Sequence, residues 1–272
     1  LNDSRARVYG EQYSDRSGAA VAGAGDVNGD GYDDVLIGAP DRGVSAGAAY
    51  LMLGPISGRM ELDEADYRMA SKSNDDRAGA SLSGAGDVDG DGLADILIGA
   101  PGIAGEAGAV YLFTADDVRS GSLLNATTRI TGRSDEQLGT AVSAGDFDGD
   151  GFSDLLLGAP ESNDGGHHAG SAHVFLGDEL SGGMTITDDD AILEGESTFD
   201  QLGTSVSGTG DINRDGYDDI LAGAPEDDNG HIVARFLASL LEHFAQLTLG
   251  LAHVLVEQLR PLHVEEIGRS VF

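Results

Sequence analysis

The chain has 272 residues and a formal net charge of −33 at pH 7, because 48 aspartate and glutamate residues outnumber 15 lysine and arginine residues. A surface of this charge repels phosphate groups, which argues against nucleic acid and anionic membrane surfaces as partners. The chain contains no cysteine, so it forms neither disulfide bonds nor thiolate metal sites, and its 40% hydrophobic content is ample for a core.

One acidic pattern occurs four times, in segments that we call loops 1 to 4. They lie at 26–34, 87–95, 146–154 and 211–219. In each loop, oxygen-bearing side chains stand at positions 1, 3, 5 and 9 and glycine at position 6, and a short apolar strand ending in Gly-Ala-Pro follows. The loops begin 61, 59 and 65 residues apart. A period of this kind predicts a repeat architecture rather than separate domains.

Each period contains the same predicted strands in the same order. The first strand lies at 6–9, 67–70, 128–130 and 191–193. A strand of small residues follows at 18–21, 79–82, 139–142 and 203–206. The acidic loop and the Gly-Ala-Pro strand come next, and the last strand lies at 48–53, 109–113 and 172–176. Four strands per period predict one antiparallel sheet per repeat, and radial packing of such sheets forms a β-propeller, an all-β fold.

The acidic loops have the residue pattern of calcium-binding loops. Ca²⁺ takes about six to eight oxygen ligands, and a chain supplies them when alternate side chains point toward the ion. Glycine at position 6 allows the tight reversal that brings the position 7 carbonyl and the position 9 carboxylate to the same ion. The predicted ligands, with position 7 acting through its backbone carbonyl, are Asp26, Asn28, Asp30, Tyr32 and Asp34; Asp87, Asp89, Asp91, Leu93 and Asp95; Asp146, Asp148, Asp150, Phe152 and Asp154; and Asp211, Asn213, Asp215, Tyr217 and Asp219. We therefore expect up to four Ca²⁺ ions.

Two other interpretations of these loops are less favoured. An EF-hand needs a glutamate at position 12 and flanking helices, whereas position 12 is apolar in all four loops and the flanking residues are typical of strands. Ordinary solvated turns can also be rich in Asp and Gly. However, carboxylates about 5 Å apart repel one another by a few kcal/mol at an effective dielectric constant near 20, which favours a bound cation.

The four loops are not equivalent. At positions 1, 3, 5 and 9, loops 2 and 3 carry four aspartates each, whereas Asn28 and Asn213 reduce the count to three in loops 1 and 4. Arg214 stands where the other loops have glycine at position 4. We expect tighter calcium binding at loops 2 and 3. Open loops of this type resemble weak extracellular calcium modules, with dissociation constants on the order of 10⁻⁴ to 10⁻³ M.

The glycine motifs carry a resemblance to a known family. Leu138-Gly139 and Leu202-Gly203 correspond to the "FG" position, and Gly-Ala-Pro occurs at 38–40, 99–101, 158–160 and 223–225. From about residue 5 to 230, the chain resembles the FG-GAP repeats of integrin α-subunit propellers and their bacterial relatives. The resemblance implies a seven-bladed ring, calcium on the blade loops of one face, and a role in cell-surface adhesion or as an accessory module. The resemblance implies that four of seven repeats are present, at about 5–60, 61–121, 122–183 and 184–230.

The composition changes at residue 231, and the segment 231–272 contains no aspartate. Apolar residues now recur at helical spacing, which predicts one or two helices over about 233–260, ended by Pro261. A transmembrane span is disfavoured because Glu242, His243, Gln246 and His253 interrupt the apolar run. The segment is interpreted either as an amphipathic cap on the last blade or as a shifted reading frame that replaced further blades.

The remaining motifs give little indication of other chemistry. His167, His168 and His173 lie near one another in the sequence and could form a soft-metal site, but we favour two solvated loop residues and one strand residue at the position of Tyr50 and Tyr111. The sequence contains no P-loop or H-E-x-x-H motif, and its carboxylates are already assigned to calcium. The chain is therefore predicted not to be an enzyme.

The sequence predicts a calcium-binding propeller module that is extracellular or on the cell surface and acts as an adhesion or interaction scaffold for a protein or matrix ligand. The alternative is an accessory propeller of a larger secreted hydrolase or phospholipase. A sugar-binding propeller is less supported, because the chain has no tryptophan and only 6% aromatic residues. Because the chain begins at Leu1 without a basic and apolar signal segment, we expect a mature region or a fragment.

Overall fold

The computed structural model describes residues 6–177 and 180–226. These residues belong to the first of two compact units, Leu1–Ser239. The predicted helical tail lies outside the described residues, and both of its interpretations stay predictions.

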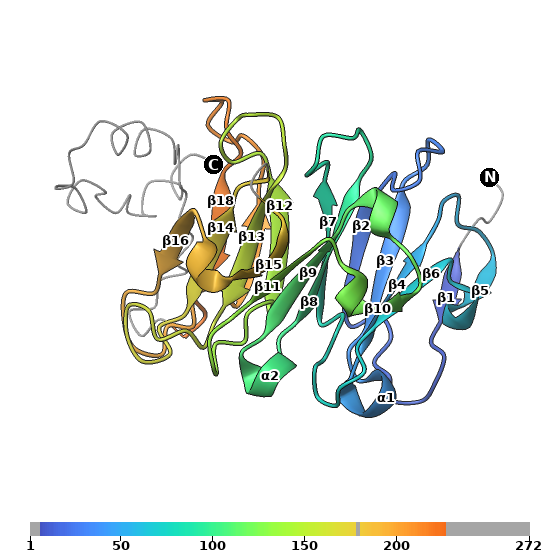
Figure 1. Ribbon diagram of the computed structural model, residues 1–272, viewed down its shortest axis with the longest axis horizontal. Helices are drawn as coiled ribbons and strands as arrows, with labels where there is room; N and C mark the ends of the chain where they lie inside the picture. Colours follow the sequence, from blue (N-terminus) through green and yellow to red (C-terminus); the bar gives the residue numbers. More distant parts are fainter. Residues whose placement is uncertain (1–5, 178–179, 227–272) are drawn as a thin grey trace, which may run out of the picture. The chain divides into compact units, whose positions relative to one another are not determined.

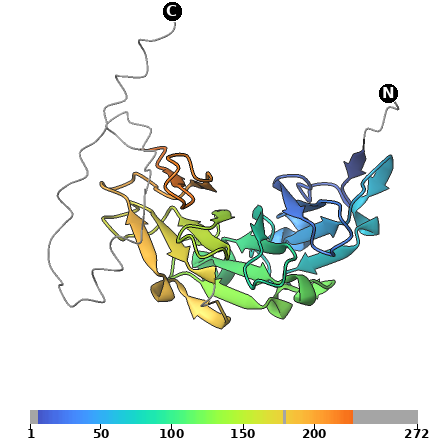
Figure 2. The same cartoon turned by 90° about the horizontal axis from the view of Figure 1, so that it is seen from above.

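The described residues form strands in several side-by-side sheets, as expected for propeller blades (Figures 1 and 2). The first sheet contains β2 (Val21–Gly25), β3 (Asp34–Ala39), β4 (Ala48–Met52) and β6 (Tyr67–Ala70). The second contains β7 (Ser81–Gly86), β8 (Asp95–Ala100), β9 (Ala109–Phe113) and β11 (Thr128–Thr131). The third contains β12 (Ala141–Gly145), β13 (Asp154–Ala159), β14 (Ser171–Phe175) and β16 (Ala191–Glu194). The fourth contains β17 (Ser205–Gly208) and β18 (Ile220–Gly223) among the described residues.

The sheets are offset by one strand from the periods of the sequence. The strand that opens the second period, β6, pairs antiparallel with β4 of the first period, with Tyr67 opposite Leu51. The same pairing joins β11 to β9 and β16 to β14. The first strand, β1 (Arg7–Tyr9), lies instead in a two-stranded sheet with β5 (Arg59–Glu61). The expectation that each period forms its own sheet is therefore wrong by one strand, because the connection between periods carries the outer strand of the preceding blade.

Three of the outer strands also pair with a parallel strand from the boundary with the next period, which the sequence did not predict. β5, β10 (Gly121–Ser122) and β15 (Gly182–Thr185) pair in parallel with β1, β6 and β11. A 3-10 turn follows each of them, at η1 (Leu62–Glu64), η3 (Leu123–Asn125) and η5 (Ile186–Asp188). The first residue of each turn is buried, so that an apolar side chain anchors the connection.

In the described part of the chain, three other short helical turns connect strands. α1 (Arg42–Ser45) and α2 (Ile103–Glu106) follow the Gly-Ala-Pro motifs of the first two blades, and η2 (Ala115–Asp117) follows β9. Residues inside α1 and α2 have positive φ angles, so each ends within a single turn.

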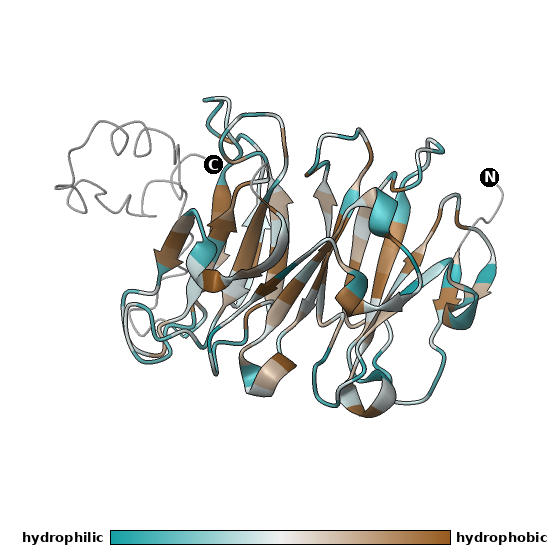
Figure 3. Cartoon of the chain, viewed as in Figure 1, coloured by the Kyte–Doolittle hydropathy of each residue, from teal (hydrophilic) through white to brown (hydrophobic). Residues whose placement is uncertain are grey.

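The core lies between the faces of neighbouring sheets. The central strands β8 and β13 are buried along their whole length, and Figure 3 shows these strands in the hydrophobic colour beside hydrophilic loops. Side chains such as Leu36, Ile98, Phe113 and Phe175 are fully or almost fully buried. Burying each such side chain stabilises the fold by about 1.5 to 3 kcal/mol.

The glycines of the FG and GAP motifs contact each other across neighbouring blades. A Cβ atom on Gly38 would lie 2.1 Å from the carbonyl oxygen of Gly79, and the pairs Gly99 with Gly139 and Gly158 with Gly203 repeat this approach at 2.3 and 2.1 Å. Gly79 has a φ of +78° and is not part of a strand, so β7 begins at Ser81, two residues after the predicted start. The predicted small-residue strands are therefore shifted toward the loops.

Candidate metal centres

The four acidic loops lie on one rim of the described unit. Each connects the first two strands of its blade, and all four project at the top of Figure 1. The hairpin geometry follows from the sequence, because the glycine at position 6 has a positive φ in every loop, between +88° and +99°.

Within each loop, the side chains at positions 1, 3 and 5 fold back onto the loop backbone. In loop 3, the amide of Asp150 donates to Asp148 Oδ1 at 3.1 Å, and the amide of Phe152 donates to Asp150 Oδ1 at 2.8 Å. The amide of Gly151 donates to Asp146 Oδ2 at 3.2 Å. The other three loops repeat these hydrogen bonds. Backbone amides thus hold three acidic or amide side chains in one turn of chain.

The carboxylate at position 9 fastens each of the first three loops to the end of the third strand of its blade. In loop 2, the fully buried Asp95 accepts hydrogen bonds from the amide of Val88 at 2.8 Å and from that of Ala115 at 2.9 Å. Asp34 and Asp154 make the equivalent bonds to Gly54 and Gly177. The sequence predicted a metal ligand at position 9 but not its hydrogen bond to the end of the third strand. The amide that donates this bond lies about twenty residues further along the chain.

Burial and neighbouring carboxylates act on these acids together. Burial, reinforced by Asp89 and Asp91, raises the pKa of Asp95 to about 6 against the opposing effect of its backbone hydrogen bonds. Burial raises the pKa of Asp154 to about 7 in the same way. Both groups are therefore less acidic than an ordinary aspartate. A bound cation would favour their ionised forms.

Loops 2 and 3 bring three carboxylates together. Oxygen atoms of Asp87, Asp89 and Asp95 all lie within 4.8 Å of one another, and the same holds for Asp146, Asp148 and Asp154. Oδ1 of Asp87 is buried and has no hydrogen-bond partner in the described part of the chain. An oxygen-only donor set with an unsatisfied buried oxygen fits a hard divalent cation.

Loops 1 and 4 balance their charge differently. The amide group of Asn28 donates to Asp30 Oδ2 at 3.1 Å, and that of Asn213 donates to Asp215 Oδ2 at 3.0 Å. No group of three carboxylates within 4.8 Å was found there among the described residues. The structure thus assembles acidic clusters at two of the four predicted sites. Coordination through positions 5 and 7 stays a prediction at every loop.

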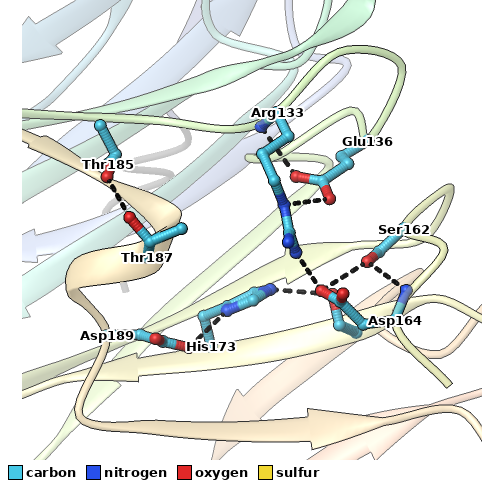
Figure 4. Close-up of polar contacts among 9 residues, drawn as sticks. Arg133, Glu136, Ser162, Asp164, His173, Thr185, Thr187 and Asp189 are labelled. Carbon is cyan, nitrogen blue, oxygen red and sulfur yellow. Dashed lines mark hydrogen bonds and ion pairs between the residues drawn. The ribbon is translucent and has the colours of Figure 1, made fainter.

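The histidines take the structural roles favoured by the sequence. His173 occupies the register position of Tyr50 and Tyr111, opposite the Gly-Ala-Pro strand of its blade. Its buried ring lies 2.8 Å from Asp189 Oδ2 through Nδ1 (Figure 4) and 2.8 Å from Ser171 Oγ through Nε2. Ser171 is itself fully buried, so its hydroxyl group is closed to a substrate.

The loop histidines have other partners. His168 pairs with Glu161 and stacks on Phe199, with ring centroids 5.8 Å apart. Nearby, Arg133 donates to Glu136 at 2.8 Å and pairs with Asp164 (Figure 4). In the described residues, the three histidines form no common metal cluster.

The repeated loops, the glycine contacts and the blade sheets agree with a comparison to known families. The FG-GAP repeat matches residues 17–52, 78–113, 138–175 and 202–234, which together make up more than half of the chain. The chain belongs to the FG-GAP repeat family. Its FG-GAP repeats each begin near the FG glycine, and the first three end with the third strand of a blade.

Relatives of this FG-GAP chain include integrin α subunits and a phospholipase. Integrin alpha-PS5 of Drosophila melanogaster is 35% identical over 56% of the chain and 16% of the relative. Integrin alpha-V of Gallus gallus is 31% identical over 60% of the chain and 15% of the relative. Phosphatidylinositol-glycan-specific phospholipase D of Bos taurus is 31% identical over 77% of the chain and 26% of the relative. The chain thus matches about a sixth to a quarter of the length of these relatives.

A search of the described residues finds no helix that is both long enough and apolar enough to cross a membrane.

Proposed function

We propose that this FG-GAP chain is a non-enzymatic, calcium-stabilised propeller module that presents a rigid surface to a protein or matrix ligand outside the cell or on its surface. The observation that carries the proposal is the set of four acidic loops at corresponding positions on one rim, two of which cluster three carboxylates. The similarity to integrin α subunits supports an interaction role.

The proposed mechanism is rigidification of this rim. Without a cation, the clustered carboxylates repel one another by a few kcal/mol per pair, and only backbone amides hold them in place. Ca²⁺ supplies the missing charge, and its preference for six to eight oxygens suits an open loop better than the strict octahedron of Mg²⁺. Position 9 then transmits the order of the loop to the end of the third strand, through bonds such as Ala115 to Asp95.

We also propose four repeats over residues 1–230, at about 5–60, 61–121, 122–183 and 184–230, with 231–272 as a separate segment. The four repeat matches support four repeats with this spacing. The sheets show that the blades exchange one strand across each boundary.

Thermal unfolding of the full chain by circular dichroism, with millimolar calcium and with chelator, tests the proposal. With a dissociation constant on the order of 10⁻⁴ M, about 1 mM calcium stabilises the folded state by about 1.4 kcal/mol per site, so several filled sites should raise Tm clearly. Asp91→Asn and Asp150→Asn should reduce Tm in calcium but should not reduce it in chelator, where removing a charge relieves repulsion. An equal loss in both conditions would assign these carboxylates to folding alone.

The second candidate is an accessory propeller of a larger secreted hydrolase or phospholipase. It is favoured by the match to phosphatidylinositol-glycan-specific phospholipase D, which extends over 77% of the chain. The full-length coding sequence distinguishes the two functions. A hydrolase domain beside the repeats would support this candidate, and further repeats or a stalk would support the scaffold.

A further inference from the structure

The acidic loops of neighbouring blades contact each other as well as their own strands. The amide of Ala94, at position 8 of loop 2, donates to the carbonyl oxygen of Asp26 at 3.1 Å. The amide of Ser153 donates to Asp87 at 3.0 Å, and that of Asp218 to Asp146 at 2.9 Å. Each of loops 2 to 4 therefore binds the backbone of position 1 in the preceding loop, and position 1 is a predicted ligand.

A second contact joins position 7 of one loop to position 4 of the preceding loop. A Cβ atom on Gly29 would lie 3.1 Å from Leu93 Cδ2, and one on Gly90 would lie 2.5 Å from Phe152 Cε1. The same atom on Gly149 would lie 2.8 Å from Tyr217 Cε1. The space that glycine leaves free at position 4 is thus occupied by an apolar or aromatic side chain from the next blade.

We propose that the cation sites are coupled along the rim, and that the position 7 side chain of each loop is a positioning residue for the site in the preceding loop. This inference rests on the proposed calcium binding. Position 7 and position 8 are adjacent in the chain, so an ion that orders loop 2 also orders the side chain of Leu93 and the amide of Ala94, which both hold loop 1. Filling one site then strengthens binding at its neighbour, and by thermodynamic linkage the effect is mutual.

Salt screening weakens the repulsion between the ions. Sheets packed face to face lie about 10 Å apart, which exceeds the Debye length of about 8 Å at physiological ionic strength. Each loop also carries more negative charge than one divalent cation supplies, because three or four aspartates surround each site.

The two ends of the row differ from its middle. Tyr32, at position 7 of loop 1, is 54% exposed, and no acidic loop precedes it in this chain. At position 4 of loop 4, Arg214 with a φ of +66° stands where the other loops offer a glycine to the next side chain. Loop 1 is therefore held through its contacts with loop 2, and its affinity for a cation should depend on Leu93.

Terbium luminescence provides a reporter at loop 1. Tb³⁺ replaces Ca²⁺ at oxygen sites and emits when a nearby tyrosine is excited, and only loops 1 and 4 contain a tyrosine. The substitution Tyr217→Phe in the full chain removes the tyrosine of loop 4 and keeps an aromatic ring against Gly149. Sensitised emission from the loops then comes from Tb³⁺ bound near Tyr32 in loop 1. Leu93→Ala in this background should weaken Tb³⁺ binding at loop 1 about fivefold or more, although every ligand of loop 1 is retained.

Two further variants sharpen the experiment. Ile192→Ala truncates a partly exposed apolar side chain on β16. It should leave the Tb³⁺ affinity of loop 1 within twofold of the value in the Tyr217→Phe chain. Asp91→Asn reduces the charge at loop 2 and retains Leu93, so it should also weaken Tb³⁺ binding at loop 1. This variant tests the coupling even if Leu93→Ala fails to fold.

Unchanged loop 1 affinity in both loop 2 variants would overturn the coupling, and so would an equal loss in Ile192→Ala. Absence of Tb³⁺ binding at both tyrosine-containing loops of the unmutated chain would instead refute cation binding at loops 1 and 4, and the coupling with it.

Discussion

At the scale of single residues, position 3 decides how each loop balances its charge. The side-chain amide of Asn28 donates a hydrogen bond to Asp30, so loop 1 contains its own compensation. Asp89 cannot donate in this way, and partial desolvation together with Asp91 and Asp87 raises its pKa. Asp148 is in the same situation in loop 3. Loops 2 and 3 therefore depend more on a cation than loops 1 and 4.

Replacing Asp89 by Asn should separate stability from ion binding. The new amide can donate to Asp91 as Asn28 does to Asp30, so the calcium-free protein should become more stable by about 1 kcal/mol. Calcium affinity at loop 2 should fall about tenfold, because one anionic ligand is lost. Thermal unfolding in chelator and calorimetric titration measure the two effects. Reduced stability in chelator would contradict the prediction.

Arg214 is the other informative residue, because it has a φ of +66° at the position where loops 1 to 3 have glycine. A non-glycine residue in the left-handed region costs about 1 kcal/mol or more. Arg214→Gly should therefore raise the stability of the chain by about this amount in thermal unfolding. Arg214→Ala removes the side chain but keeps the strain, and equal effects of the two substitutions would show that the backbone is not the cause.

At the scale of elements, the contact between GAP and FG glycines holds adjacent blades together. The carbonyl oxygen of Gly79 lies where a side chain on Gly38 would begin, so the two backbones pack directly. Gly23 lies in the neighbouring strand β2, and a Cβ atom there would meet nothing within 4 Å. The chain thus contains a matched pair of glycines, one at a blade contact and one with free space.

Gly38→Ala should destabilise the protein by about 3 kcal/mol, because the methyl group forces the blades apart. Gly23→Ala should change the free energy of unfolding by less than about 0.5 kcal/mol. Denaturant unfolding of both variants at fixed calcium measures the difference. Similar losses in the two variants would mean that the glycine contact between blades is unimportant.

The elements also show what could be predicted from the sequence. The acidic loops, the Gly-Ala-Pro strands and the outer strands have strong local patterns, and the structure confirms the blade sheets that they form. The parallel strands β5, β10 and β15 have only two to four residues and pair with a strand more than fifty residues away in the sequence, so no local periodicity indicates them. The second role of Asp95 was missed for a similar reason, since Ala115 is brought to it only by the folded blade.

At the scale of the whole molecule, the net charge of −33 makes stability sensitive to pH and to divalent cations. Four calcium ions would offset eight of these charges. Two of the acids with raised pKa values, Asp95 at about 6 and Asp154 at about 7, lie at the candidate metal centres, so protons and calcium compete there.

In chelator, the stability contributed by protonated Asp154 should be present below about pH 4 and should be lost as pH rises toward 7, because the folded-state pKa exceeds the ordinary value near 3.9. In calcium the trend should weaken or reverse, since the ionised group binds the cation. Denaturant unfolding between pH 4.5 and 8 tests this, with Asp154→Asn as the control that lacks the titrating group. A pH profile in chelator that is identical for both proteins would contradict the assignment.

The offset of one strand between sheets and sequence periods affects how such a chain can change in length. Each period gives its first strand to the preceding blade. When one complete period is added or removed, the strand that follows the junction is again a first strand, and it can pair with the blade before the junction. Every blade on either side of the junction then keeps four antiparallel strands. Duplication and loss of whole periods therefore keep the blades complete, whereas a deletion that is not a whole number of periods would leave a strand without its partner.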